Sequence, residues 1–388
     1  MKLSEQTINR ENTRAAKYDF REKLFGSDDI LPMWVADMDL PAPKALQDAI
    51  IKRAEHNIYG YTNHDDHLLK IIQSWLKRRH DYEVDSSQIT FTPGVIPALH
   101  ALVQSFTEVG DKIVIQPPVY PPFFSVVKNH NRELVESPLQ LQNGQYKMNF
   151  EDLEQQFKNG AKAFILCSPH NPVSRVWTEE ELQQLADLCV KYNVYLFSDE
   201  IHADIVFNGY KHTPIAKLNE QISAITFTLM APSKTFNVAG LQGSFVISPN
   251  NELKKQLEKQ LSQQGFGLLN TFAYVAMEAT FQHGDAWLEE LIPLLEENYK
   301  YLESELNNRT KIKPIKPEGT YLIWLDFTQT GYSHKEIKSK LNEEAKVGLN
   351  DGVTFGKDVG DQFMRINIAA PTETVKEATK RLVEAFGE

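Results

Sequence analysis

The feature that most constrains the fold is a series of short apolar runs separated by amphipathic helical patterns. The runs predict strands at residues 112–115, 163–167, 194–198, 224–228 and 244–247. Turn-forming residues bound each run, as expected of strands that are buried on both faces of a sheet. The clearest helical pattern, at 179–191, begins with a candidate capping box formed by Thr178 and Glu181. This alternation predicts an α/β fold with a mostly parallel central sheet.

Composition narrows the class of protein. The chain has 388 residues and a net charge of -11, which argues against an extended nucleic-acid surface. No run approaches the roughly 18 apolar residues of a membrane span, and the first residues lack a signal-peptide pattern. Cys167 and Cys189 lie in apolar segments without metal-ligand spacing. We therefore expect buried free thiols and a cytoplasmic location.

The last hundred residues follow a different pattern, typical of a smaller α+β unit. A long amphipathic helix is followed by two strand-like segments and a closing helix, at 287–307, 321–326, 363–368 and 372–386. We expect an N-terminal segment that is part of the small domain, a large α/β domain and a small C-terminal domain, at 1–45, 46–284 and 285–388.

A lysine and an aspartate follow two of the predicted strands. Lys234 comes after the run at 224–228, and it is either a solvated surface lysine or a cleft lysine with a lowered pKa. Asp199 ends the run at 194–198, where it is either a helix cap or a ligand-binding carboxylate. A lysine that bonds to a carbonyl cofactor, with an acid that keeps a ring nitrogen protonated, is what pyridoxal phosphate chemistry needs.

Other strand ends carry candidate ligand-binding residues. Gly94 precedes a helical pattern whose N-terminus favours an anion. Tyr120 is either a packed aromatic or a ring stacked on a flat ligand, and Asn171 is either a turn residue or a donor to a ligand oxygen. Arg365 lies within a strand pattern, as an edge arginine or as a fork for a carboxylate. In a parallel sheet, the strand-end residues would all face one site.

Three further patterns are discounted. The glycine-rich segment at 265–270 lacks the third glycine of a dinucleotide fingerprint and follows a polar helix at 252–264. The segment at 64–67, with two histidines and two aspartates, is interpreted as a solvated loop. Asp37 and Asp39 are interpreted as turn and capping residues and not as a carboxylate pair.

Taken with their chain order, these motifs resemble the fold-type I pyridoxal-phosphate enzymes of the aminotransferase class I/II group. The resemblance covers nearly the whole chain, and it is closest to the cystathionine β-lyase or cysteine C–S lyase branch, the MalY/PatB type. The segments that carry it are 31–39, 59–62, 118–123, 198–202 and 233–237. It implies a large domain with a mostly parallel sheet, a smaller α+β domain and pyridoxal 5'-phosphate as cofactor.

The resemblance also implies roles for single residues. Lys234, Asp199 and Tyr120 would be catalytic, with Lys234 joined to the cofactor, Asp199 at the pyridine nitrogen and Tyr120 on the ring. The remaining cofactor contacts would be Asn171 at the phenolic oxygen, Gly94, Val95, Ile96 and Ser233 at the phosphate, His202, and Tyr61 from the neighbouring subunit of a homodimer. Substrate contacts would be Arg365 at the α-carboxylate, with Trp34, Ala36, Tyr59 and Tyr61.

Two departures from the general aminotransferase pattern fit the lyase branch. His202 stands where many aminotransferases have a tyrosine, and Gln242 stands where many have a phosphate-binding arginine. The resemblance therefore implies a β-lyase that acts on cystathionine or other S-substituted L-cysteines. An aminotransferase and a regulatory binding protein on the same fold are the alternatives. Trp34, Tyr59 and Phe123 are expected to form an apolar wall that favours alkyl substituents.

Overall fold

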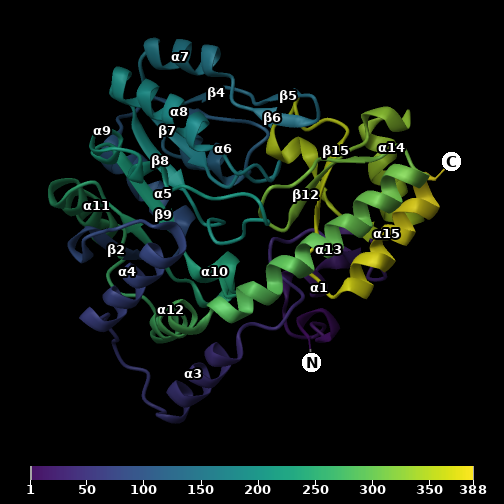
Figure 1. The fold of residues 1–388 in the computed structure, drawn as a ribbon, viewed down its shortest axis with the longest axis horizontal. Coiled ribbons are helices and arrows are strands. Elements are labelled where there is room, and N and C mark those ends of the chain that lie inside the picture. Colours follow the sequence, from purple (N-terminus) through teal and green to yellow (C-terminus); the bar gives the residue numbers. More distant parts are fainter. Residues whose placement is uncertain (1, 388) are drawn as a thin grey trace.

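The computed structural model describes residues 2–387 and has a seven-stranded sheet at its centre (Figure 1). In spatial order the strands are β2 (Ile89–Thr92), β10 (Ser244–Ile247), β9 (Thr226–Met230), β8 (Tyr195–Asp199), β7 (Ala161–Cys167), β3 (Lys112–Ile115) and β4 (Glu133–Glu136). Pairing is parallel from β9 to β4, whereas β10 is antiparallel to both β9 and β2. The predicted mostly parallel sheet is confirmed. The C-terminal ends of β2, β3, β7, β8 and β9 therefore lie along one edge.

Helices cover both faces of this sheet. They are α5 (Val95–Phe106), α6 (Pro122–Lys128) and α11 (Asn251–Gln263) on one face, and α7 (Phe150–Lys158) and α8 (Glu179–Tyr192) on the other. Alternate residues of β7 point to opposite faces of the sheet. Ala163 and Ile165 pack with α5, while Phe164 and Leu166 pack with α8. The capping box predicted at Thr178 is present at the start of α8.

A second, antiparallel sheet lies beside the first. Its strands are β11 (Lys313–Pro314), β12 (Leu322–Asp326), β15 (Phe363–Asn367) and β14 (Asn350–Asp351), and the helices around it are α13 (Asp285–Arg309), α14 (His334–Ser339) and α15 (Thr372–Phe386). In Figure 1, α13 crosses from α12 (Thr271–His283) to α15. This arrangement agrees with the α+β unit expected from the sequence, and the division at residue 285 stays a prediction.

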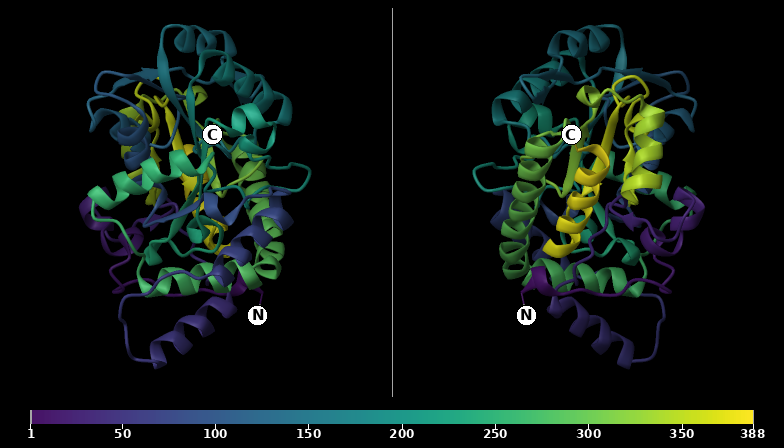
Figure 2. Two further views of the ribbon diagram at one scale, coloured as in Figure 1. Left: turned by 90° about the vertical axis from the view of Figure 1, so that its left-hand side faces the viewer. Right: turned by 90° about the vertical axis from the view of Figure 1, so that its right-hand side faces the viewer.

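The N-terminal segment lies against this second unit. Its short strand β1 (Leu31–Pro32) pairs in parallel with β13 (Val347–Gly348), and its first helices are α1 (Ala16–Asp19) and α2 (Arg21–Phe25). The following helix α3 (Lys44–Glu55) packs on α12 and extends from the body of the molecule (Figure 2). His64 and Asp65 form an exposed loop as predicted, whereas Asp66 and His67 belong to the first turn of helix α4 (Asp66–His80), which Asp65 caps, so the prediction was wrong for these two residues.

Among residues 2–387, no helix is both long enough and apolar enough to cross a membrane. Both cysteines are buried and free, as expected from the sequence.

Candidate active site

A cavity of about 210 Å³ lies at the edge of the sheet where the parallel strands end. It brings together residues that follow five different strands, namely Gly94, Val95, Ile96, Tyr120, Asn171, Asp199, His202, Ser233 and Lys234. Ala36, from the N-terminal segment, also lines this cavity. The prediction that the strand ends face one site is therefore confirmed by the residues that line this cavity.

Lys234 lies in the short helix α10 (Pro232–Thr235), which begins with a proline at its first position. The Lys234 amine donates a hydrogen bond of 2.7 Å to the carbonyl oxygen of Ala36. Burial, and then the charge of Arg365, lower the pKa of this amine to about 8, although Asp37 and Asp199 oppose the shift. Near neutral pH a useful fraction is therefore unprotonated and able to act as nucleophile or base.

Asp199 is buried at the end of β8, where it lines the cavity. Its Oδ1 accepts a hydrogen bond of 3.1 Å from the backbone N–H of Ile201. Burial raises the pKa of the carboxyl group to about 7, against the opposing effect of Lys234. A cationic ring nitrogen placed against this carboxylate would restore its ionised form, because an opposite charge offsets the cost of burial.

His202 and Tyr120 are the ring-bearing residues of the cavity. Burial, and then the charges of Lys234 and Arg365, lower the pKa of His202 to about 3, so its imidazole is neutral. The imidazole packs edge-on against Tyr321 at 5.8 Å, and its Nδ1 has no hydrogen-bond partner within the described part of the chain. Burial raises the pKa of Tyr120. Phe123, expected in a substrate wall, is instead fully buried in the core beside α5.

The end of the cavity near α5 offers neutral hydrogen-bond donors. Gly94 precedes the helix without a side-chain cap, so the first backbone N–H groups, at Val95 and Ile96, remain for a ligand. Ser233 and Gln242 line the same cavity. Backbone amides at a helix N-terminus, with a hydroxyl and a side-chain amide, suit a phosphate group.

Arg365 lies on β15 and reaches the wall of the cavity. Its guanidinium donates to Asn171 Oδ1 and to the carbonyl oxygen of Trp34, both at 3.0 Å, and to Asn350 Oδ1. Within residues 2–387 no carboxylate lies within 4.0 Å of this guanidinium, and burial lowers its pKa to about 10. A buried cation that contacts only neutral acceptors favours the binding of an anion.

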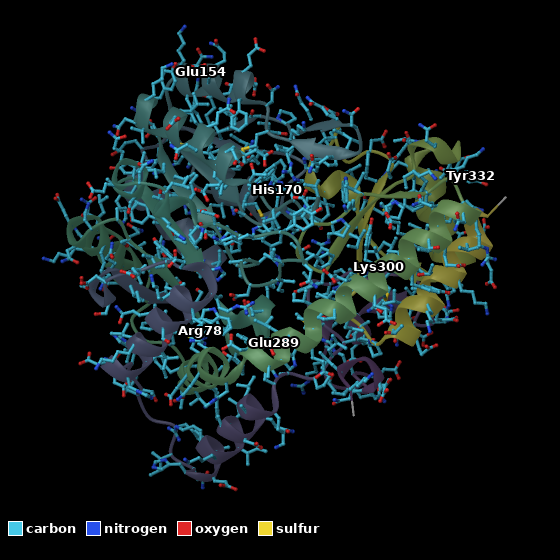
Figure 3. All side chains as sticks on the ribbon, in the orientation of Figure 1. Arg78, Glu154, His170, Glu289, Lys300 and Tyr332 are labelled. Carbon is cyan, nitrogen blue, oxygen red and sulfur yellow. The ribbon has the colours of Figure 1, made fainter. Side chains whose placement is uncertain are left out.

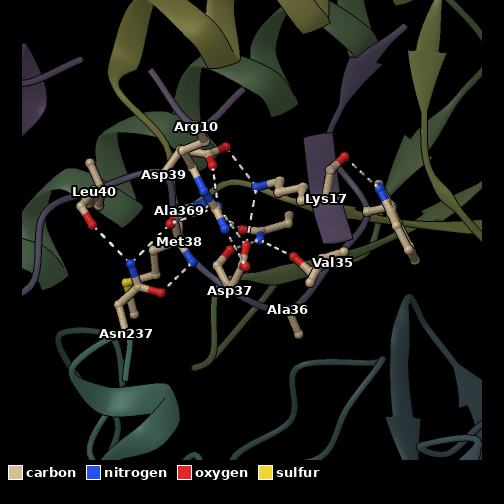
Figure 4. Close-up of polar contacts among 12 residues, drawn as sticks. Arg10, Lys17, Val35, Ala36, Asp37, Met38, Asp39, Leu40, Asn237 and Ala369 are labelled. Carbon is tan, nitrogen blue, oxygen red and sulfur yellow. Dashed lines mark hydrogen bonds and ion pairs between the residues drawn. The ribbon is translucent and has the colours of Figure 1, made fainter. Parts of the chain in front are cut away.

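The loop at 34–40, which supplies Ala36, is held by a cluster of four charged side chains (Figure 4). Arg10 contacts Asp37 and Asp39, each at 2.7 Å, and Lys17 contacts Asp39 at 2.7 Å. The interpretation of Asp37 and Asp39 as turn and capping residues was therefore wrong. Both are ion-pair partners, because the fold brings the N-terminal segment across the loop.

Two asparagines hold the same loop from its other sides. Asn237, just after α10, accepts a bond of 2.9 Å from the Met38 N–H and donates to the carbonyl oxygen of Leu40 at 2.9 Å (Figure 4). Asn367, on β15, donates to the carbonyl oxygens of Val35 and Asp37. The loop that faces Lys234 is thus fixed both by the segment after α10 and by β15.

Tyr59 and Tyr61 lie away from this cavity. They line a separate hollow of about 730 Å³ together with Gly265, residues 267–270 of the loop before α12, and the first two residues of α12. Tyr61 is 102% exposed, so it makes no contribution to the cavity of its own chain. Trp34 contributes its carbonyl oxygen to Arg365, while its ring packs against Phe25 at 5.8 Å. The substrate-binding roles of these three aromatic residues stay predictions.

Sequence reasoning did not find several residues that shape the site. They are Arg10, Lys17, Tyr321, Asn350 and Asn367. The hydroxyl of Tyr321 donates to the Ala36 carbonyl at 2.9 Å. No local pattern marks these positions, because each lies far along the chain from its partner. A buried histidine next to Asn171, His170, also supports the cavity wall from the middle of the molecule (Figure 3).

The chemistry of this cavity fits pyridoxal 5'-phosphate. The cavity holds an amine of lowered pKa, a buried carboxylate, a tyrosine ring and a set of uncharged hydrogen-bond donors that suit an anion. The site and fold together define a pyridoxal-phosphate-dependent enzyme of fold type I. The sequence profile of the aminotransferase class I and II family matches residues 34–382, and the chain belongs to this family.

Its relatives include proteins named for C–S bond cleavage. Cystathionine beta-lyase PatB of Bacillus subtilis is 42% identical over 96% of this chain and 97% of its own. Cystalysin from Treponema denticola, whose structure contains pyridoxal 5'-phosphate, is 34% identical with a TM-score of 0.95, over 98% of this chain and 97% of its own. The pyridoxal-phosphate-bound C–S lyase from Staphylococcus hominis is 31% identical with a TM-score of 0.91, over 100% and 98%.

Proposed function

We propose that the protein is a carbon–sulfur β-lyase that cleaves cystathionine or other S-substituted L-cysteines to a thiol, pyruvate and ammonia. The main observation behind this proposal is that the Lys234 amine and the Asp199 carboxylate face one cavity. Arg365, a buried cation, contacts the wall of the same cavity. A base, a ring-nitrogen partner and a carboxylate receptor are thereby held together. The names of the relatives at 42% and 31% identity, a cystathionine beta-lyase and a C–S lyase, support this class of substrate.

The cofactor, when bound, would supply a carbonyl carbon that takes the substrate amino group in exchange for the Lys234 amine, and a ring that withdraws electrons from Cα. Arg365 binds the substrate α-carboxylate with its guanidinium fork and so fixes the direction of the Cα–H bond. Lys234 Nζ then takes the Cα proton as general base. Asp199 holds a proton at the ring nitrogen by its negative charge. The thiolate leaves Cβ as the electrons from Cα form the Cα–Cβ double bond. The 2-aminoacrylate that remains takes up water to give pyruvate and ammonia, so no keto-acid substrate is needed.

Because a β-lyase needs no keto-acid acceptor, an assay with and without one tests the proposal. Pyruvate and free thiol are measured with the cofactor-loaded protein and cystathionine or S-alkyl cysteine, with and without a keto-acid acceptor. A lyase forms pyruvate at the same rate in both conditions. Product formation that requires the acceptor would instead identify an aminotransferase. Protein that stays colourless after addition of pyridoxal 5'-phosphate would contradict both functions.

We further propose that the active unit is a homodimer in which Tyr61 contacts the cofactor of the neighbouring subunit. Exposed apolar side chains gather near Tyr61 in support of this, at Ile58, Tyr59, Phe266 and Leu268. Tyr59, Trp34 and Ala36 would then lie near the substrate. The buried free thiols of Cys167 and Cys189 support a reducing cytoplasm as the place of action.

A further inference from the structure

A buried carboxylate that the proposed reaction does not use lies behind the active site. Asp204 follows β8, whose last residue is Asp199, in the same loop as His202, and it is 6% exposed. Its Oδ1 accepts from the indole N–H of Trp75 at 3.1 Å and lies 2.8 Å from Nε2 of His80. Its Oδ2 accepts from the hydroxyl of Thr235 at 2.8 Å. The two oxygens therefore hold two different elements.

One of those elements needs such support. Lys234 and Thr235 belong to α10, which spans only Pro232–Thr235, and one helical turn has little stability of its own. The other element, α4, is a helix of 15 residues that buries Ile72, Trp75 and Leu76 in the core. Asp204 thus connects the turn that carries Lys234 to a rigid helix and to the loop that begins at Asp199.

The contacts around Asp204 keep it charged and fixed. Burial would raise the pKa of this carboxyl group, yet the hydrogen bond and charge of His80, with the Thr235 hydroxyl, hold the pKa below its ordinary value. Trp75 also packs edge-on against Phe236, the residue after Thr235, at 5.6 Å. The same three elements are therefore joined by both polar and aromatic contacts.

We propose that Asp204 is a positioning residue that, through the Thr235 hydroxyl, sets the orientation of the Lys234 amine relative to Asp199. This inference rests on the proposed function, because it assigns Lys234 the role of base. Asp204 itself does not line the cavity and touches no reacting atom. The charged groups that act on the Lys234 amine are Arg365, Asp37 and Asp199, and Asp204 is not among them. Its effect is therefore one of geometry.

Thr235→Val tests the proposal, because it removes the hydroxyl and leaves a side chain of similar shape. Thr235→Ser keeps the hydroxyl, and Thr379→Val removes a buried hydroxyl bond on α15, far from the site. For each purified holoenzyme we would measure kcat and KM for an S-alkyl cysteine, the thermal midpoint, and the pH midpoint of the visible band of the bound cofactor. Asp204→Asn is a second variant that acts on the same contacts.

We expect Thr235→Val to lower kcat at least tenfold with KM changed less than twofold, and to raise the pH midpoint of the visible band by half a unit or more. Thr235→Ser should match the parent, and Thr379→Val should change only the thermal midpoint. A Thr235→Val protein that loses thermal stability but keeps kcat and the pH midpoint would overturn the proposal, as would an equal loss in Thr235→Ser. If Asp204→Asn does not fold, Thr235→Val alone decides. A parent protein without the visible band would instead refute the proposed function.

Discussion

The amine of Lys234 donates its hydrogen bond to the carbonyl oxygen of Ala36, a residue 198 positions earlier in the chain. The Tyr321 hydroxyl donates to the same oxygen at 2.9 Å. One backbone carbonyl thus receives the proposed base from α10 and a phenol from the residue before β12. In the cofactor-free protein the loop at 34–40 therefore holds the Lys234 amine through this carbonyl.

Replacing Lys234 should abolish both colour and catalysis. Lys234→Ala removes the amine that joins the cofactor and accepts the Cα proton, so we expect pyruvate formation to fall by about 10³-fold or more. Absorbance of the protein after addition of pyridoxal 5'-phosphate, together with the pyruvate assay, checks this. Lys259→Ala, on the surface helix α11, is the matched control and should leave both unchanged. Full activity in Lys234→Ala would exclude the mechanism.

Arg365 should matter through its shape as well as its charge. Arg365→Lys keeps a cation but loses the fork that binds a carboxylate with two hydrogen bonds, so we expect kcat/KM to fall about 10²-fold, and further in Arg365→Ala. Steady-state kinetics with an S-alkyl cysteine measures the effect. Arg309→Lys, which is exposed and pairs with Glu305, should behave as the parent. Unchanged kinetics in Arg365→Lys would remove Arg365 from the substrate site.

In the cofactor-free protein, the contribution of Asp199 to the free energy of unfolding should be least favourable at alkaline pH. Because the folded pKa of Asp199 is about 7 against an ordinary 3.8, the folded state holds a proton that the unfolded state loses first. The stability linked to this group is therefore present below about pH 4 and is lost as the pH rises through 7. Lys234 titrates in a separate window, between about 8 and its ordinary 10.5.

This pH dependence can be measured by comparing the stability of the parent protein with that of an Asp199 variant. Asp199→Asn in the cofactor-free protein should increase the free energy of unfolding by about 1–3 kcal/mol at pH 8, and by much less at pH 5, because a buried unpaired charge is removed. Urea unfolding at the two pH values checks this. The same variant should lose activity when loaded with cofactor. A variant that is equally destabilised at both pH values would contradict the assigned pKa.

The ion-pair cluster of the N-terminal segment should stabilise the fold more than surface pairs do. Lys17 is 1% exposed beside Asp39, so Lys17→Met leaves that carboxylate with Arg10 alone and should lower the free energy of unfolding by about 1–3 kcal/mol. Lys44→Met breaks a pair with Asp48 in which the lysine is 73% exposed, and should cost less than about 1 kcal/mol.

A double variant then separates the pair from the lost side chain. Lys17→Met with Asp39→Asn should lose less than the sum of the two single variants, because the coupling between the partners is counted once. Strict additivity in urea unfolding would mean that the two side chains act independently.

Mixing two inactive variants tests whether Tyr61 serves the neighbouring subunit. Tyr61→Ala and Lys234→Ala are unfolded together and refolded, so that hybrid dimers form. If Tyr61 acts across the interface, each hybrid has one site with both defects and one intact site, and activity returns to roughly a quarter of the parent value for random pairing. If Tyr61 acts within its own chain, no intact site forms. The pyruvate assay on the mixture distinguishes the two outcomes.

The sequence predicted five of the seven strands of the large sheet, because the signals of those strands are local, and it missed β2 and β4. Strands β3 and β10 have the predicted bounds, since each apolar run is closed by a turn on both sides. Strand β9 begins two residues later than predicted, at Thr226, because Ile225 belongs to the turn after helix α9 (Glu220–Ser223) and Met230 still pairs with β10. Apolar residues in a turn are not distinguishable from strand residues by pattern alone.

In the candidate site, too, the residues with a local sequence signal were predictable and those that depend on tertiary packing were not. Residues such as Asp199 and Lys234 were predictable because the C-terminal ends of parallel strands meet at one edge of a sheet. The contacts of Asp37 with Arg10, and of Ala36 with Tyr321, were not, because they join segments whose proximity arises only from tertiary packing. Local reasoning about Asp37 could see a turn and no cation.

The place of β10 between β2 and β9 has a consequence for how the chain reaches its native state. The hydroxyls of Thr92 and Ser244 meet across β2 and β10 over a separation of 152 residues, so this pairing forms only after a large loop closes. Until then β10, which pairs with the nearby β9, keeps an unpaired edge that another nascent chain can occupy. Refolding at high concentration should therefore favour aggregates over enzyme.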